Sequence, residues 1–382
     1  MVLKKLPRNA AMDGVDLYRR LDEPGDGSVL GDPARIEAFI GELRTNLTAS
    51  LTTRSTVAGW RAQALFASLV AALDECDLMT LVDAGEVYYA DDSVKPPDYF
   101  LHLRSGKRML VDVKNVALRE QDSFDTPVKF TSSEVTRMRE FGDRFGADVF
   151  LALYVPIMAT WLLVDIDDLT DGPGGGKRIT VQNAILRNQL HLLGDKYVGT
   201  AYPLEFVMRP DPSVSSKRQP KDEDGKQSFQ FKVGSIELLA GGVPITDPQE
   251  RRILHFFMLY GPWNEEEIPL IVDGELVEIR FKFTPDEIHE GGKEMLGTLA
   301  SMYSRMFEYN TSDETGPLAL DINVEPGTLV TLIPHDFDFA NSTLPVVLLT
   351  VHPADKESEG AAVDDGPGEY RSGSVSRVST DA

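Results

Sequence analysis

The chain has 382 residues with 61 acidic and 38 basic side chains, a net charge of −23 at pH 7 and one cysteine. Its hydrophobic fraction of 42% suffices for packed cores, so wholesale disorder is excluded. The single Cys76 excludes a disulfide framework and a thiolate zinc site, because both need several cysteines. The acidic balance argues against a protein that coats nucleic acid non-specifically, yet it allows a nuclease with one local basic groove.

The charge is uneven along the chain. Residues 1–170 hold 19 basic and 27 acidic side chains, and residues 171–382 hold 19 and 34. The first half is therefore the more favourable place for a polyanion, while the second half favours protein partners over DNA.

The sequence predicts no targeting signal and no membrane span. The first seven residues are followed by no apolar stretch of the kind that a signal peptide needs. The longest uncharged run, residues 149–164, is interrupted by Pro156 and has β-branched and aromatic flanks, which indicates two buried strands. We therefore expect a cytoplasmic protein with no membrane association.

Two helices are predicted after a polar, glycine-containing lead-in at residues 1–31. Asp32 and Pro33 supply an N-cap and a first-turn proline. The apolar positions that follow at helical spacing are Ile36, Phe39, Ile40, Leu43 and Leu47. A second, longer helix is expected from Ser55 to Leu73.

Strands and one more helix are predicted up to residue 166. Residues 105–107 are a hairpin turn signal, and Thr131 to Glu134 form a capping box that opens a helix. The expected strands are Glu86–Ala90, Asp98–Arg104, Arg108–Lys114, 149–155 and 161–166. The predicted order from residue 55 is therefore α, β, β, β, α, β, β.

The second half begins with a glycine-rich break at 171–177, a helix at 181–193 and a long polar segment at 209–227. The later predicted elements are a helix at 251–260, a hairpin of strands 268–272 and 275–283, a helix opened by a capping box at 284–287, and strands at 318–324, 328–333 and 346–351. From Ala354 onward no apolar periodicity is found, which is typical of a disordered tail.

Residues 97–114 carry the side chains best suited to chemistry. In a hairpin that turns near Gly106, facing positions have numbers that sum to about 211, so Asp98 is expected at the same open end as Asp112, one row away. Asp112 and Lys114 are two positions apart and share one face of their strand. The hairpin thus gathers two carboxylates and one ammonium at one end of a small sheet.

This grouping suits phosphodiester hydrolysis. Carboxylate oxygens hold Mg²⁺, which polarises a scissile phosphate and activates a water, and a lysine can orient that water or stabilise developing charge. The structural alternative is that Asp98 caps a strand and that Asp112 and Lys114 form a solvated ion pair worth under about 1 kcal/mol. The apolar residues 109–111 favour a central strand, in which charges are costly without a role.

Pro97-Asp98 and Asp112-Val113-Lys114 resemble the two halves of the motif of the PD-(D/E)XK nuclease superfamily. The resemblance implies the restriction-endonuclease-like fold, an α/β (α+β) class with an αβββαβ core. It also implies Asp98 and Asp112 as ligands of Mg²⁺, with Mn²⁺ as a substitute, and Lys114 as a catalytic residue.

The resemblance covers roughly residues 55–166 and suggests two further site residues. Family members often carry a Glu or Gln on the first helix, for which Gln63 is the candidate. Glu86, on the strand before the hairpin, is a candidate additional metal ligand. The sequence does not choose between them.

Composition and the predicted elements, together with this resemblance, divide the chain into five segments. They are a lead-in and helix at 1–54, a nuclease-like domain at 55–200, a linker or long loop at 201–227, a C-terminal α+β domain for recognition or partner binding at 228–353, and a disordered acidic tail at 354–382.

The resemblance implies a Mg²⁺-dependent DNA endonuclease or exonuclease, with restriction, phage defence and repair as settings by analogy of fold. The alternative is a catalytically inactive or partner-gated adaptor that binds a protein such as an ATPase or helicase through the acidic C-terminal domain. An RNA-directed nuclease is a third hypothesis, because nothing in the sequence separates DNA from RNA. The oligomeric state stays open: many nucleases of this fold act as homodimers, but no coiled-coil heptad is recognisable.

Two other features could contact phosphate. Residues 172–178 resemble a phosphate loop, but Asp171 stands at its first glycine position and Arg178 replaces the Ser or Thr, so a flexible loop is favoured. The basic residues after the motif would either track phosphates or form ordinary solvated helix charge. They are Lys129, Arg137, Arg139 and Arg144.

Overall fold

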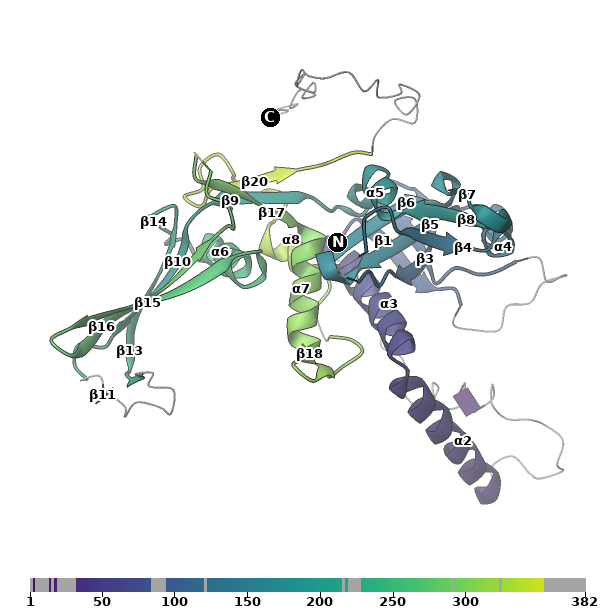
Figure 1. Ribbon diagram of the computed structural model, residues 1–382, viewed down its shortest axis with the longest axis horizontal. Coiled ribbons are helices and arrows are strands. Elements are labelled where there is room, and N and C mark those ends of the chain that lie inside the picture. Colours follow the sequence, from purple (N-terminus) through teal and green to yellow (C-terminus); the bar gives the residue numbers. More distant parts are fainter. Residues whose placement is uncertain are drawn as a thin grey trace, which may run out of the picture.

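The structure, a computed structural model, has an α+β fold in which two five-stranded sheets flank a group of helices (Figure 1). It describes residues 3, 14, 17–18, 32–83, 94–119, 122–214, 217–218, 228–289, 291–322 and 325–353. The predicted strand Glu86–Ala90, the tail from Ala354 and most of the lead-in lie outside these residues.

The first sheet has the strand order β1-β2-β3-β5-β6. Its strands are β1 (Cys76–Leu81), β2 (Tyr99–Leu103), β3 (Arg108–Asn115), β5 (Asp148–Val155) and β6 (Thr160–Asp165). Helix α3 (Arg54–Leu73) covers one face, and α4 (Ser132–Phe145) packs on the other. β3 and β5 are parallel because α4 connects them across the sheet, and the other neighbours are antiparallel. This sheet and its helices thus have the order αβββαβ, but the first strand is Cys76–Leu81, which the sequence analysis did not predict, and the predicted first strand Glu86–Ala90 is not tested.

Strand β3 is buried on both faces. Val111 and Val113 belong to the core under α3, whereas Leu110 belongs to the core under α4. Successive side chains of a strand point to opposite faces, so a strand between two helical layers needs an uninterrupted apolar run. Asp112 interrupts that run at a position that is only 2% exposed.

The second sheet has the order β14-β13-β10-β16-β15. Its strands are β10 (Leu204–Pro210), β13 (Val233–Ala240), β14 (Val243–Pro244), β15 (Asn264–Val272) and β16 (Glu275–Thr284). The hairpin predicted around Asp273 and Gly274 is confirmed as β15 and β16, and both turn residues adopt positive φ, 52° and 84°. The distal end of this sheet projects from the rest of the molecule (Figure 1).

A third sheet and three helices connect the two halves. The strands are β9 (Tyr197–Ala201), β17 (Lys293–Thr298) and β20 (Val346–Leu349), and the helices are α6 (Pro248–Tyr260), α7 (Leu299–Thr311) and α8 (Thr328–Leu332). The predicted helix at 251–260 and the predicted strand at 346–351 are confirmed within these bounds.

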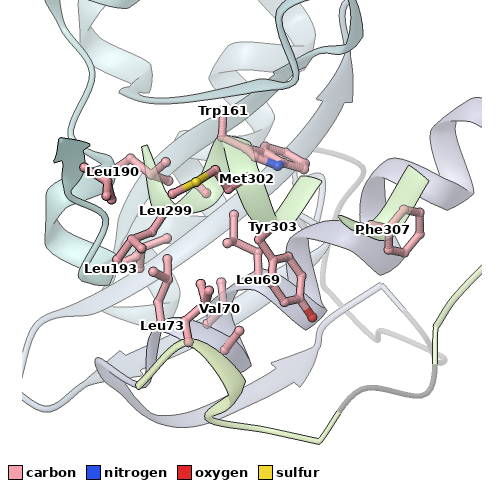
Figure 2. Close-up of a cluster of buried hydrophobic side chains, with 14 of the residues drawn as sticks. Leu69, Val70, Leu73, Trp161, Leu190, Leu193, Leu299, Met302, Tyr303 and Phe307 are labelled. Carbon is pink, nitrogen blue, oxygen red and sulfur yellow. The ribbon is translucent and has the colours of Figure 1, made fainter. Parts of the chain in front are cut away.

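Helix α7 packs against the first sheet and α3, so one continuous core runs from Ala62 to Val346. Figure 2 shows Leu69 of α3 beside Met302 of α7 and Trp161 of β6. Burying each such side chain contributes about 1.5–3 kcal/mol to stability. The C-terminal half therefore helps to hold the first helix of the αβββαβ core in place.

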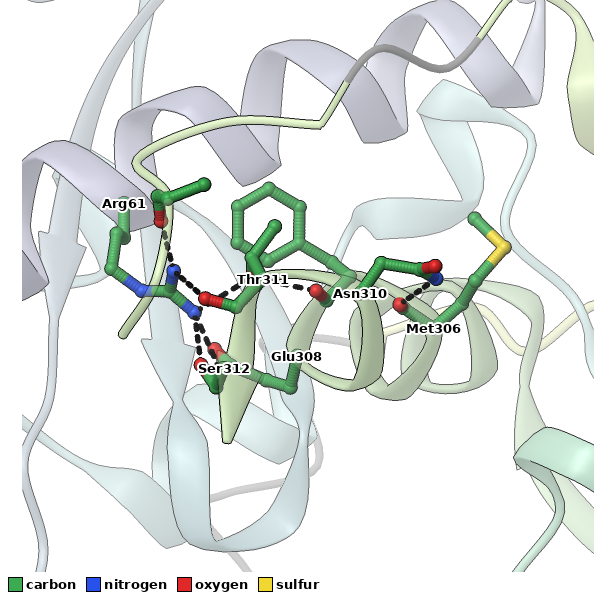
Figure 3. Close-up of polar contacts among 8 residues, drawn as sticks. Arg61, Met306, Glu308, Asn310, Thr311 and Ser312 are labelled. Atoms are coloured by element: carbon green, nitrogen blue, oxygen red, sulfur yellow. Dashed lines mark hydrogen bonds and ion pairs between the residues drawn. The ribbon is translucent and has the colours of Figure 1, made fainter. Parts of the chain in front are cut away.

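Arg61 joins α3 to the end of α7 in the same region (Figure 3). Its guanidinium donates to Glu308 Oε2 at 2.6 Å and Ser312 Oγ at 2.9 Å, and it lies 5.2 Å from the centre of the Phe307 ring. Arg61 is only 5% exposed, so these partners replace the water that a buried cation loses. It lies two residues before Gln63 and fixes that part of α3.

Several predicted elements after residue 180 are wrong. The capping box at 284–287 opens no helix, because strand β17 intervenes and Gly291 and Gly292 have positive φ of 114° and 60°. The helix begins at Leu299 instead, where the Thr298 side chain accepts a hydrogen bond from the Ser301 amide.

Three more predicted elements after residue 180 are wrong. Residues 328–332 form α8 and not a strand, and the described part of 318–324 contains no strand. The predicted helix at 181–193 divides into α5 (Val181–Leu186) and a 3₁₀ turn at Leu190–Leu193. Short apolar runs fit either helix or strand, and their tertiary contacts decide between them.

Helix α3 is the one described helix whose length and mean hydropathy, 1.3, fit a membrane span. Eight of its 20 residues are buried within the fold. This burial is typical of a core helix. The sequence analysis predicted no helix that is long and apolar enough to fit a membrane span.

Candidate active site

The open end of the β2–β3 hairpin brings the predicted site residues together. Tyr99 pairs with Val111, so facing positions sum to 210 and Asp98 comes level with Asp112, not one row away from it. Asp98 immediately precedes β2, and Asp112 and Lys114 lie on β3. Helix α3 brings Gln63 to the same place, 2.8 Å from Asp98.

Asp98 is held by two hydrogen bonds and is 8% exposed. Its Oδ2 accepts from the Val113 amide at 2.6 Å, and its Oδ1 accepts from Gln63 Nε2 at 2.8 Å. Burial, followed by the negative charge of Asp112, raises the pKa of Asp98 to about 7, against the opposite effects of the Val113 hydrogen bond and Lys114. The carboxyl is therefore poised between its two protonation states near neutral pH.

Asp112 forms an ion pair with Lys114 and lies 3.8 Å from the ammonium of Lys95. Burial acts to lower the pKa of Lys114, but the charge and hydrogen bond of Asp112, with help from Asp98 and Glu134, outweigh it and raise this pKa. Lys114 is therefore a charged ammonium at neutral pH beside two carboxylates.

Two residues that the sequence analysis did not assign to the site lie at its edge. Lys95 pairs with Glu134, which stands in the first turn of α4. Burial acts to raise the pKa of Glu134, but its hydrogen bond and ion pair with Lys95, together with Lys114, lower it overall. The capping box marked Glu134 only as a helix residue, and nothing in the local sequence singles out Lys95.

A third carboxylate, Asp83, stands where β1 leads away from the sheet. Its neighbour Val82 donates its amide to the Asp98 carbonyl at 2.9 Å. Burial and the charge of Asp112 raise the pKa of Asp83, although hydrogen bonds to its own backbone and to Asp98 oppose this. Glu86, the predicted additional ligand, lies outside the described residues.

The basic residues considered as phosphate contacts differ in their surroundings. Arg139 pairs with Asp167 at 2.6 Å, and Arg144 lies 3.8 Å from Glu140. Lys129, on β4 (Pro127–Phe130), is the strand neighbour of Arg178 on β8 (Lys177–Thr180). Lys129 and Arg178 therefore lie side by side on one small sheet. This surface suits a polyanion better than Arg139 and Arg144 of α4, which are paired with carboxylates.

The glycine-rich segment before Arg178 is no phosphate loop. It connects β7 (Thr170–Asp171) to β8 in an antiparallel pair, and Gly172 donates its amide to the Gly176 carbonyl at 2.7 Å. A phosphate loop joins a strand to a helix, whose N-terminus faces the anion.

The donor set at this site fits a hard divalent cation. Asp98 and Asp112 supply carboxylate oxygens, and their mutual repulsion is relieved by a positive ion between them. Mg²⁺ is often held by one or two carboxylates with waters and substrate phosphate completing its shell. Within the described ranges, no group of three or more Asp, Glu, His or Cys side chains has the spacing of a complete metal site.

No protein-family model matches the chain, and no curated protein matches it. Among solved structures, it is similar to Hjc of Archaeoglobus fulgidus, a Holliday junction resolvase from an archaeal hyperthermophile, with 20% sequence identity and a TM-score of 0.24. The similarity covers 30% of this chain and 85% of that chain. At these values the similarity carries no functional argument, so the assignment below depends on the site.

Proposed function

We propose that this protein is a Mg²⁺-dependent nuclease of the PD-(D/E)XK type that hydrolyses phosphodiester bonds of DNA. The observation that carries the proposal is the buried carboxylate pair, Asp98 and Asp112, beside the charged Lys114 at one end of the first sheet. Buried charges are costly, and two like charges held together are more so, unless a ligand compensates for them.

In this proposal Asp98 and Asp112 hold the metal, and Lys114 acts on the reacting groups. The metal would supply charge neutralisation at the phosphate and a more acidic bound water. Lys114 would orient that water or stabilise the negative charge that develops on the phosphate. Gln63 and the Val113 amide fix the Asp98 carboxylate, which limits the reorganisation needed when the metal enters.

The wider assignment follows from the same proposal. Residues 55–200 would form the nuclease domain of a cytoplasmic protein. Residues 228–353 would recognise the substrate or a partner, together with strand β10, which the structure shows within the predicted linker 201–227. Lys129 and Arg178 would contact the DNA backbone. Restriction, phage defence and repair remain the settings proposed by analogy of fold.

The second candidate function is a nuclease-fold adaptor that binds a protein partner. It is favoured by the fact that protein groups already compensate for part of the carboxylate charge: Gln63 donates a hydrogen bond to Asp98, and Lys114 pairs with Asp112. In an adaptor these contacts would be structural, and no metal would be required.

Metal binding separates the two functions. Isothermal titration with Mn²⁺ or Mg²⁺ is expected to show binding by the wild type and its loss in Asp112→Asn. Asp148→Asn is the matched control, because Asp148 also pairs with a lysine but its side chain is 62% exposed. Absence of binding by the folded wild type, or equal binding by Asp112→Asn, would overturn the nuclease proposal.

A further inference from the structure

Helix α2 (Pro33–Thr52) differs from the other long helices of the fold. It has 20 residues, none of them buried, and it projects away from the first sheet beyond the start of α3 (Figure 1). An isolated helix of this length is marginal in water, so most helices of this kind are stabilised by packing of an apolar face. The described part of the chain provides only limited cover for α2.

A stripe of large apolar side chains runs along α2. Ile36, Ile40 and Leu47 are 38%, 39% and 47% exposed, and Leu43 lies between them on the same side. The successive spacings of four, three and four residues correspond to the seam of a two-helix coiled coil, a short pattern that the sequence analysis missed. Exposed apolar stripes of this type mark interaction surfaces.

One flank of the stripe is contacted by Tyr18. Tyr18 lies edge-to-face on Phe39, with ring centroids 5.1 Å apart. Phe39 is displaced to one side of the seam, because position 39 is rotated by about 60° from position 36 at 100° per residue. The stripe itself remains open to a second helix.

The charges beside the stripe are self-complementary. Glu37 and Arg44 are both exposed and lie along the other flank, one heptad apart and on either side of the middle of the stripe. In an antiparallel pair of identical helices, Glu37 meets Arg44 of the partner subunit, and the same contact occurs twice by symmetry. In a parallel pair, the flank that carries Glu37 and Arg44 would instead face the opposite flank of the second helix, and this contact would be lost.

We propose that the occupant of this stripe is α2 of a second copy of the chain, in an antiparallel, two-fold pair. Ile36 packs against the partner subunit's Leu47, and Ile40 packs against the partner subunit's Leu43. Two Glu37–Arg44 contacts set the register. The proposal is independent of the nuclease assignment, because it depends only on α2.

Sedimentation or light scattering of the full-length protein tests this pairing. The wild type is expected at twice the chain mass of 42.2 kDa, and Ile40→Glu at the chain mass. The body of the fold is expected to remain intact in Ile40→Glu, because α2 contributes no buried residue, and circular dichroism checks this. Glu42→Arg, away from the stripe, is the matched control and should stay dimeric.

Charge exchange tests the antiparallel register. Glu37→Arg and Arg44→Glu are each expected to raise the dimer dissociation constant about tenfold. The double variant, and an equimolar mixture of the two single variants, should regain wild-type affinity because opposite charges meet again. A monomeric wild type, a dimer unaffected by Ile40→Glu, or failure of both exchanges to restore affinity would overturn the proposal.

Discussion

The two ends of the β2–β3 hairpin carry the same pair of residue types in different surroundings. At the turn end Lys107 lies 3.0 Å from Asp148, and at the open end Lys114 pairs with Asp112. Both lysine side chains are 34% exposed, but the Asp148 side chain is 62% exposed and the Asp112 side chain is 3% exposed. The two pairs therefore differ in the burial of the carboxylate and not in chemistry.

This difference separates a surface ion pair from a candidate catalytic group. Water solvates Asp148, so its pair with Lys107 contributes about 0–1 kcal/mol. Asp112 has lost its water and stands beside a second carboxylate, Asp98, whose pKa is raised to about 7 by burial and by Asp112. Such a costly arrangement is consistent with a function at the open end.

The largest expected difference between the two ends of the hairpin is in how protein stability depends on pH in the absence of metal. Because the pKa of Asp98 is raised from 3.8 to about 7, its stabilising contribution is complete below pH 3.8 and is lost as the pH rises to about 7. Asp98→Asn should flatten the fall in the urea midpoint between pH 4 and pH 7, measured in EDTA. Asp148→Asn should keep the wild-type slope. The pKa of Asp195 is also raised to about 7, but Asp195 contributes equally to both proteins. An unchanged slope in Asp98→Asn would therefore contradict a raised pKa of Asp98.

The next effect concerns removal of each lysine. Deleting one partner of a fully buried ion pair costs about 3–5 kcal/mol. Since water reaches Lys114, we expect Lys114→Ala to lower the free energy of unfolding by about 1–2 kcal/mol, and Lys107→Ala by about 0–1 kcal/mol. Urea denaturation in EDTA at pH 7.5 measures both. Equal losses would show that the two ends are energetically alike.

An effect similar in size to that of Lys114→Ala is expected at Gln63, which orients Asp98 without being one of the charged groups. Gln63→Leu removes the 2.8 Å hydrogen bond to Asp98. Loss of a hydrogen bond that orients a metal ligand weakens metal binding about 10–100-fold, so the Mn²⁺ dissociation constant should rise by at least about tenfold. Titration of Gln63→Leu tests this, with Gln182→Leu on the exposed side of α5 as control. A wild-type dissociation constant for Gln63→Leu would mean that Gln63 has no part in orienting the ligand.

The sequence predicts the hairpin and its open end well because both depend on local signals. The turn at residues 105–107 fixes the register to within one position, and alternation along β3 places Asp112 and Lys114 on one face. The contribution of Lys95 depends on a contact with Glu134, 39 residues away, which no local pattern encodes. The same holds for Arg61, whose partners lie some 250 residues further along the chain.

The failures after residue 280 have a related cause. The helix predicted from the capping box at 284–287 exists, but its N-cap is Thr298, 14 residues after the predicted N-cap Thr284. Two glycines with positive φ and the pairing of β17 with β9 override that local signal. A cap predicts where a helix can begin, and tertiary pairing decides where it does begin.

Cleavage of plasmid and single-stranded DNA with Mg²⁺ or Mn²⁺ tests whether Lys114 at the open end of the hairpin acts in catalysis. We expect cleavage by the wild type and by Lys107→Ala, and a loss of at least about 10²–10³-fold in both Lys114→Ala and Lys114→Met. The Lys107 variant matches the exposure and pairing of the Lys114 variants, and circular dichroism confirms folding. Equal cleavage by the wild type and both Lys114 variants would contradict the assignment of the active site to the open end of the hairpin.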